Sequence, residues 1–185
     1  MWLRNKKNIA AFCLIFLFIS TYSLDSFTQI REYLIKSAFI EKITRFIEWP
    51  DEKIKEKEEI VFGIISNNRE VINTMQFYFT DQLIQNKKVQ VKQISDYRKL
   101  NEYDIIFIAN DYHNNINSII EQITNMHILL ITEKDGYGER GAHINLILNA
   151  NKINFEINPD QLNKEGFYVS SKIYAYAEIV KKPNL

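Results

Sequence analysis

Three short, uninterrupted apolar runs constrain the fold of this chain more than any other feature. They are "EIVFGIIS" (Glu59–Ser66), "YDIIFIAN" (Tyr103–Asn110) and "HILLITEK" (His127–Lys134), and none of them alternates apolar with polar residues. Such runs are typical of strands that are buried on both faces of a sheet. The chain must therefore place other layers of structure on both sides of these strands.

Segments with helical periodicity separate the runs. "REVINTMQFYFTDQLIQ" (Arg69–Gln85) follows the first run, and "NNINSIIEQITN" (Asn114–Asn125) precedes the third. Between them, "KKVQVKQI" (Lys87–Ile94) alternates as a strand does. Strands that alternate with helices predict an α/β fold with a mostly parallel sheet covered on both faces, a three-layer α/β/α sandwich.

The two ends of the chain predict different elements. "FTQIREYLIKSAFIEKITRFIEWP" (Phe27–Pro50) predicts one long amphipathic helix that ends near Trp49, because proline disfavours helical geometry at the residue before it. "AHINLILN" (Ala142–Asn149) and "KINFEINP" (Lys152–Pro159) predict an antiparallel hairpin. A terminal helix is expected over Ser170–Lys181.

The first residues have the layout of a secretory signal peptide. Three basic residues precede an apolar run of 11 residues, Ile9–Ile19, and small and polar residues follow it. This run is too short to cross a hydrocarbon core, which needs roughly 20 residues. We expect cleavage after Ser23, with Ser26 as the alternative. The predicted organisation is a signal peptide at 1–23 and a single domain at 24–185, which is periplasmic and does not span the membrane.

Composition narrows the chemistry of the exported domain. The only cysteine, Cys13, lies inside the apolar run and leaves with the signal peptide, which excludes disulfides and cysteine metal sites. Removal of the three basic residues leaves 20 basic against 23 acidic residues, a net charge of about −3. No basic stripe of the kind that binds nucleic acid is present. No cofactor or metal site is predicted.

A serine hydrolase is the first chemical hypothesis to weigh. The residue types of a triad are all present: Ser170, Ser171, Asp135, His113, His127 and His143. The serines lack the G-x-S-x-G turn that exposes a nucleophile at the end of a strand. A serine pair at the start of a helix is more often an N-cap, whose loss costs about 1 kcal/mol. We therefore expect Ser170 and Ser171 to cap the terminal helix, and we expect no enzyme.

A glycine-containing loop supports a second hypothesis. "KDGYGERGAH" (Lys134–His143) stands at the end of a predicted parallel strand, where open α/β sheets bind ligands. It matches neither the Walker motif nor G-x-G-x-x-G. A periplasmic domain that binds a small molecule at this loop is therefore the alternative, and a loop that redirects the chain into the hairpin is the favoured interpretation.

Five stretches in chain order resemble the signatures of the YfiR family of periplasmic proteins: "YLIKSAFIEKITRFIEWP", "FGIIS", "GERGAHINL", "INFEIN" and "GFYVSSKIYAYAEIV". The resemblance implies a non-enzymatic regulator that binds the periplasmic domain of an inner-membrane signalling protein. The partner that the resemblance implies is a diguanylate cyclase, whose repression lowers cyclic di-GMP, or a histidine kinase. The resemblance leaves open whether the regulator acts as a homodimer.

The resemblance also marks individual positions for a role in the fold or in partner binding. These signature residues are Trp49, Pro50, Gly141, Ile144, Asn145, Phe155, Glu156, Ile157, Asn158, Ser170 and Ser171. The chain departs from the family at Ala142 and His143, where a glycine and a methionine are usual, and it lacks the cysteines of some members.

Aromatic residues are enriched in protein interfaces, so they form a further set of candidates. They are Tyr33, Phe39, Trp49, Phe77, Tyr168 and Tyr174. For each of them, a place in the core is an equally good interpretation.

Overall fold

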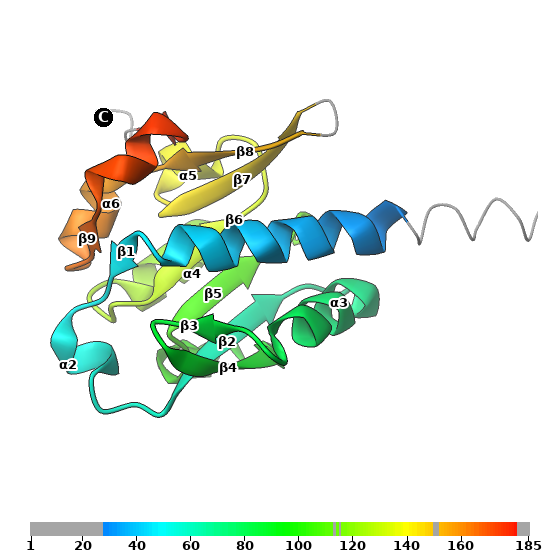
Figure 1. The fold of residues 1–185 in the computed structure, drawn as a ribbon, viewed down its shortest axis with the longest axis horizontal. Coiled ribbons are helices and arrows are strands. Elements are labelled where there is room, and N and C mark those ends of the chain that lie inside the picture. The colour runs from blue at the N-terminus through cyan, green and yellow to red at the C-terminus, as the bar shows by residue number, and fades with distance from the viewer. Residues whose placement is uncertain (1–27, 113, 115, 150–151, 181–185) are drawn as a thin grey trace, which may run out of the picture.

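A computed structural model describes residues 28–112, 114, 116–149 and 152–180. The predicted signal peptide lies outside the described residues. An eight-stranded sheet forms the centre of the molecule (Figure 1), in the order β10-β8-β7-β6-β5-β2-β4-β3. Its strands are β2 (Glu59–Ile65), β3 (Leu83–Ile84), β4 (Lys87–Gln93), β5 (Ile105–Ile108), β6 (Leu129–Thr132), β7 (Ile144–Asn149), β8 (Lys152–Ile157) and β10 (Glu178–Ile179).

Five neighbouring strands of this sheet are parallel, in the spatial order β4-β2-β5-β6-β7. Taken in chain order, that is the sequence 2-1-3-4-5 of a doubly wound sheet, which reverses direction between β2 and β5. β8 pairs with β7 in the predicted antiparallel hairpin, and β3 pairs antiparallel with β4. The mostly parallel sheet and the hairpin are confirmed.

Helices cover both faces of the sheet, which confirms the three-layer prediction. The first helix (28–44) and α3 (Arg69–Phe79) pack on one face. The other face carries α4 (Ile116–Ile123), the short α5 (Tyr137–Arg140) and the 3-10 helix η1 (Tyr97–Glu102).

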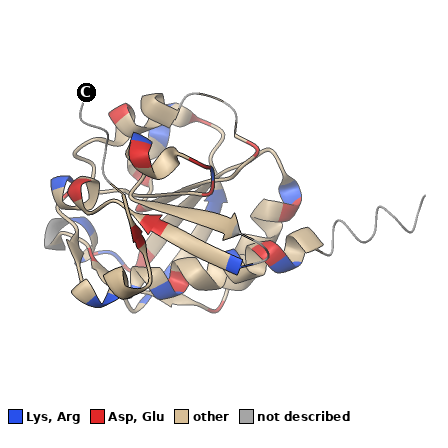
Figure 2. Cartoon of the chain, turned by 90° about the horizontal axis from the view of Figure 1, so that it is seen from above, with Lys and Arg blue, Asp and Glu red and all other residues tan. Residues whose placement is uncertain are grey.

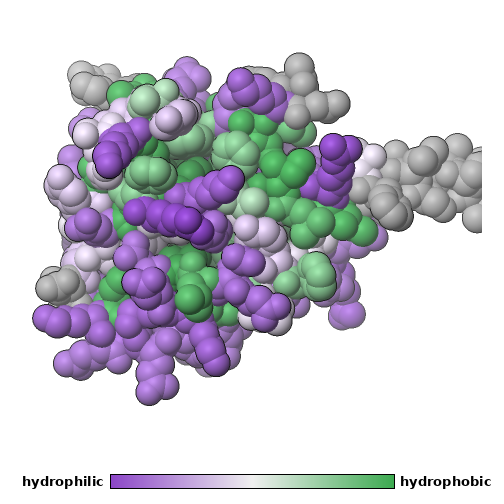
Figure 3. All heavy atoms as spheres, viewed as in Figure 1, coloured by the Kyte–Doolittle hydropathy of each residue, from purple (hydrophilic) through white to green (hydrophobic). Residues whose placement is uncertain are grey.

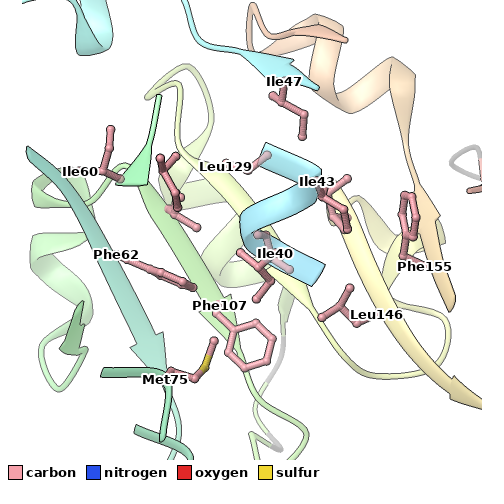
Figure 4. Close-up of a cluster of buried hydrophobic side chains, with 14 of the residues drawn as sticks. Ile40, Ile43, Ile47, Ile60, Phe62, Met75, Phe107, Leu129, Leu146 and Phe155 are labelled. Atoms are coloured by element: carbon pink, nitrogen blue, oxygen red, sulfur yellow. The ribbon is translucent and has the colours of Figure 1, made fainter. Parts of the chain in front are cut away.

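The buried strands send alternate side chains into two separate cores. In β5, Phe107 belongs to the core beneath the first helix, whereas Ile106 belongs to the core beneath α4. Figure 4 shows Ile40 and Ile43 of the first helix among side chains from several strands, with Phe107 and Leu146 close by. The first helix therefore closes the centre of one core.

The first helix ends earlier than predicted. It stops at residue 44, and a turn leads into β1 (Ile47–Glu48), which pairs antiparallel with β9 (Tyr168–Val169). The Gln85 side chain donates hydrogen bonds from Nε2 to the carbonyl oxygens of Thr44, at 3.0 Å, and Ile47, at 2.8 Å. These carbonyls find partners outside the helix, so the chain leaves it before Trp49 and Pro50.

The predicted terminal helix is also replaced. Its residues form the 3-10 helix η2 (Ser171–Ala175) and then β10, which pairs with β8. Ser170 stands at the N-cap of η2, but its side chain makes no capping hydrogen bond. Its backbone N–H instead donates to the carbonyl of Phe46 at 2.9 Å. The predicted serine cap is therefore wrong, because tertiary pairing fixes this segment through the backbone.

The charged connection before β2 is anchored to the sheet by a buried carboxylate. It begins with α2 (Asp51–Ile54), and Lys57 Nζ lies 2.6 Å from Oδ1 of Asp104, which is fully buried at the start of β5. The other carboxylate oxygen of Asp104 accepts a hydrogen bond from the backbone N–H of Val61 at 2.9 Å. One buried carboxylate thus ties this connection to two parallel strands.

Candidate functional site

A buried polar network is centred on Asn145 of β7 and includes a second signature residue, Glu156 of β8. Asn145 Oδ1 accepts hydrogen bonds from Thr132 Oγ1 at 2.7 Å and from the backbone N–H of Lys134 at 3.1 Å. Asn145 Nδ2 donates to Glu156 Oε2 at 2.8 Å. This side chain therefore links the end of β6 to both strands of the hairpin, and its fully buried amide has partners on both sides.

Asn158, directly after β8, makes separate hydrogen bonds to two helices. Its Oδ1 accepts a hydrogen bond from the backbone N–H of Gln161 at 3.1 Å and so caps α6 (Pro159–Lys164). Its Nδ2 donates to the carbonyl of Gly138 in α5 at 3.0 Å. Asn158 therefore holds α5 and α6 together at the end of β8.

Helix α5 packs close to β8 at Gly138, next to the Glu156 carboxylate. A Cβ atom on Gly138 would lie 2.5 Å from Glu156 Oε2, so a larger residue there would displace the Glu156 carboxylate. Burial raises the pKa of the Glu156 carboxyl, and the nearby carboxylates of Glu178, Glu139 and Asp135 raise it further, whereas the hydrogen bond from Asn145 lowers it.

A second group, the aromatic seam of Trp49, Phe167 and His143, joins the first helix region to the hairpin. The rings of Trp49 and Phe167 meet edge to face at a centroid distance of 5.5 Å, and His143 meets Phe167 at 5.6 Å. His143 Nδ1 accepts a hydrogen bond from the backbone N–H of Leu130 at 3.0 Å. Burial lowers the pKa of His143 to about 3, so its imidazole is neutral.

Most of the eleven predicted signature residues lie in the hairpin or near the aromatic seam. Six of them lie in the hairpin or directly after it, namely Ile144, Asn145, Phe155, Glu156, Ile157 and Asn158, and Gly141 ends α5 just before the hairpin. Trp49 lies in the seam and Pro50 directly follows it, the Ser170 backbone is bonded to Phe46, and Ser171 is exposed at the start of η2. Most of these residues are buried, so they shape the domain from inside.

The predicted interface aromatics divide by exposure. Tyr33 and Trp49 are buried, and Phe39 and Tyr174 are partly buried against the core. Phe77 on α3 and Tyr168 on β9 are exposed. The last two are therefore the aromatics of this set that a partner reaches most readily.

The triad candidates do not gather around the serines. The Ser170 backbone is tied to Phe46, and the ring of His143 is enclosed in the seam. His127 lies in a left-handed turn before β6, and its Nδ1 is 2.7 Å from the carbonyl oxygen of Glu165. Asp135 is exposed, and His113 lies outside the described residues.

A shallow apolar groove, which the sequence patterns did not single out, lies between the first helix and the hairpin. Figure 3 shows apolar atoms gathered there, with hydrophilic residues around them. The groove encloses about 200 Å³ and is lined by Thr28, Arg31, Glu32, Ile35, Leu148 and Ile153. Ile35 is 41% exposed and Leu148 is 44% exposed. The sequence feature that could have indicated this groove is Ile35, an isoleucine outside the apolar stripe of the first helix.

Surface charge, metal-ligand clusters and membrane-spanning helices indicate no further functional site among the described residues. Lysines and arginines are interspersed with aspartates and glutamates over the described surface (Figure 2). Among the residues that the structure describes, no three histidine or acidic side chains gather in a way that would hold a metal ion. Within the same residues, none of the helices has the length and apolar character needed to span a membrane.

Comparison with known sequences assigns the family. A sequence model of the YfiR/HmsC-like family, DUF4154, matches residues 33–178. The chain belongs to this family. The match takes in both the polar network and the aromatic seam, and membership in the YfiR/HmsC-like family supports a periplasmic regulatory role in general. Among curated proteins, none matches the sequence significantly.

Solved structures share the fold of this YfiR/HmsC-like chain at low identity. A conserved domain protein from Vibrio cholerae O1 biovar El Tor is similar at a TM-score of 0.50 and 13% identity, covering 71% of this chain and 57% of its own. An ABC domain in complex with L-Trp, from Streptococcus pneumoniae, is similar at 0.50 and 8% identity, covering 76% and 61%. The chain therefore spans about three fifths of the length of these structures.

Proposed function

We propose that residues 1–23 direct export and that the domain 24–185 binds the periplasmic domain of an inner-membrane signalling protein and modulates its output. A diguanylate cyclase or a histidine kinase is the class of partner, and a cyclase would connect the protein to cyclic di-GMP. The match of residues 33–178 to the YfiR/HmsC-like family is the observation that carries this proposal.

The apolar groove supports a contact site on the first helix and the hairpin. Ile35 and Leu148 expose apolar surface beside the charged Arg31 and Glu32. An apolar centre with a polar rim is the usual anatomy of a protein interface. The signature residue Phe155 lies in the core beneath the first helix and supports this surface from within.

The test is a crosslinking pull-down of the tagged, signal-processed protein from its own cell envelope, with mass spectrometry of the captured proteins. We expect an inner-membrane protein with a periplasmic sensor domain and a cytoplasmic cyclase or kinase domain. Ile35→Asp should reduce this capture at least tenfold, because it places a charge in the apolar centre of the contact.

Phe77→Asp is the matched control, since Phe77 is also exposed but lies on α3, away from the groove. Capture that is lost in the Phe77 variant and kept in the Ile35 variant would move the contact to α3. Failure to recover any membrane signalling protein with the wild type would refute the proposed function. Sedimentation of the same preparations tells whether the free regulator is a homodimer.

Ligand binding at the Lys134–His143 loop is the second candidate. Arg140, Gly141 and His143 border a small hollow of about 160 Å³ between α4 and α6. A small molecule that raises the melting temperature of the wild type, but not that of Arg140→Ala, would support this site.

A further inference from the structure

A polar cavity of about 380 Å³ lies at the carboxyl ends of β2 and β5, where the strand order of the sheet reverses. Doubly wound sheets bind their ligands in the crevice at this switch point. The lining comes from the first helix, α3 and the loops that follow the two strands: Gln29, Glu32, Tyr33, Lys36, Asn68, Val71, Asn110 and Asp111.

A buried ion pair forms one wall of this cavity. Lys36 of the first helix is 4% exposed, and its Nζ pairs with the carboxylates of Glu32 and of Glu133, which follows β6. Glu133 Oε1 also accepts hydrogen bonds from the Tyr33 hydroxyl at 2.6 Å and from the Asn110 backbone N–H at 2.7 Å. Burial and the Glu133 charge raise the pKa of Tyr33, so its hydroxyl remains a donor.

The ion pairs of Lys36 with Glu32 and Glu133 neutralise the positive charge of the cavity. Lys36 is the only lysine or arginine among the described residues that line it, and two protein carboxylates already neutralise that charge. An anionic ligand would therefore find no available cation there. Burying a charged group is tolerated only where it is paired in this way.

On the opposite wall, only one of the two carboxylate oxygens of Asp111 accepts hydrogen bonds from described residues. Asp111 Oδ2 accepts hydrogen bonds from the backbone N–H groups of Asn67 at 2.6 Å and Asn68 at 3.2 Å, and from Ser66 Oγ at 3.1 Å. Asp111 therefore already occupies the amino-terminal end of α3. Its Oδ1 is buried and has no hydrogen-bond partner among the described residues, which is unfavourable for a carboxylate oxygen.

Charge and hydrogen bonding together select the ligand. Three carboxylates face one ammonium in and directly behind the cavity, and Asp111, which lines the cavity, keeps one buried carboxylate oxygen without a hydrogen-bond partner among the described residues. We propose that this cavity binds a small organic cation, with a primary ammonium or guanidinium group that donates hydrogen bonds to Asp111 and Glu32. Such groups form the strong, charge-assisted hydrogen bonds that carboxylates prefer.

The same cavity adjoins the apolar groove. Glu32 lines both of them, and Tyr33 and Lys36 belong to the helix that forms one side of the groove. A bound cation would thus contact the first helix next to the proposed partner surface. The ligand proposal itself does not depend on that partner, because binding is measured on the isolated chain.

The test uses isothermal titration with probes of one length and different charge: putrescine, its neutral analogue 1,4-butanediol and the dianion succinate. Agmatine adds a guanidinium group. We expect saturable, one-to-one binding of putrescine or agmatine and none of the other two. Asp111→Asn and Glu32→Gln should each weaken the cation at least about tenfold, the effect of losing one charge-assisted hydrogen bond.

Asp81→Asn is the matched control. Asp81 lines a different hollow beside Glu41 and Arg45, so this variant should keep wild-type affinity. Since Asp111 also holds the start of α3, circular dichroism checks its fold, and the Glu32 variant tests the site independently. The proposal is overturned if neither cation binds the folded wild type, if both site variants bind as the wild type does, or if succinate binds more tightly than putrescine.

Discussion

At the scale of single residues, His143 is a buried imidazole, and no carboxylate among the described residues offsets the cost of charging it. It is 3% exposed, it lies against Phe167, and its Nδ1 accepts a backbone hydrogen bond. Burial lowers its pKa from 6.5 to about 3. Between these two pH values the unfolded chain binds a proton that the folded chain excludes, so folding stability falls as the pH falls below 6.5.

His143→Met should remove this acid sensitivity. At pH 7 we expect the variant to be less stable by about 1–3 kcal/mol, because the Leu130 N–H loses its acceptor. By pH 5 the advantage of the wild type over the variant should shrink by about 2 kcal/mol, since each pH unit in the window is worth about 1.4 kcal/mol. Urea unfolding at pH 7, 6 and 5 measures both free energies. A difference that stays constant with pH would show that the buried ring does not titrate on unfolding.

At the scale of elements, close packing around the central strand β2 leaves no room for a side chain at Gly63. A Cβ atom there would come within 2.6 Å of Tyr103 Cδ1 and would also meet the end of the Ile94 side chain. Gly136, by contrast, has a φ of +75° and open space around it. The two glycines are therefore required for different reasons, close packing in the first case and backbone conformation in the second.

Substituting alanine at each glycine separates these reasons. Gly63→Ala should lower the free energy of unfolding by about 1–3 kcal/mol through overpacking. Gly136→Ala should cost about 1 kcal/mol, from the left-handed conformation alone. Urea unfolding of the two variants measures both effects. If Gly63→Ala were as stable as the wild type, the contact of β2 with Tyr103 would have to be looser than the structure shows.

The elements also show which features sequence patterns predict well. β2, β5 and β6 follow directly from their apolar runs, because burial on both faces demands apolar residues at every position. The end of the first helix depends on Gln85, about 40 positions away in the chain, and the C-terminal segment depends on pairing with β8. Local periodicity contains neither of these contacts.

The candidate sites follow the same rule. Asn145, Glu156 and Asn158 were predicted as family positions, but the hydrogen bonds of Asn145 to Glu156 and of Asn158 to Gly138 follow from the order of the strands. The groove and the switch-point cavity combine residues of the first helix with residues far along the chain. The order of the strands brings these lining residues together, so no single stretch of sequence predicts either site.

At the scale of the whole molecule, one sheet shared by two cores should make unfolding a single transition. Small single domains with continuous cores usually unfold in this way. In a chain that begins at residue 24, Trp49 is the only tryptophan, and it reports on the aromatic seam. Its fluorescence and the far-ultraviolet circular dichroism should therefore give coincident urea transitions.

Ile40→Ala tests whether the core beneath the first helix unfolds together with the aromatic seam. Ile40 is fully buried beneath the first helix, and its truncation should cost about 2–5 kcal/mol. Both probes should move to lower urea concentration by the same amount. Separate midpoints would mean that the seam and the helical core unfold as independent units.

The short strands at the two ends of the sheet have a consequence for aggregation. β3 and β10 contain two residues each, and they cover one end of β4 and of β8. Along its length, β4 exposes the side chains of Lys88, Gln90 and Lys92. Long, flat, apolar edges recruit strands from other molecules, whereas short or lysine-rich edges do not. The most apolar strands, β5 and β6, lie in the interior of the sheet, so the folded protein offers them to no neighbouring chain.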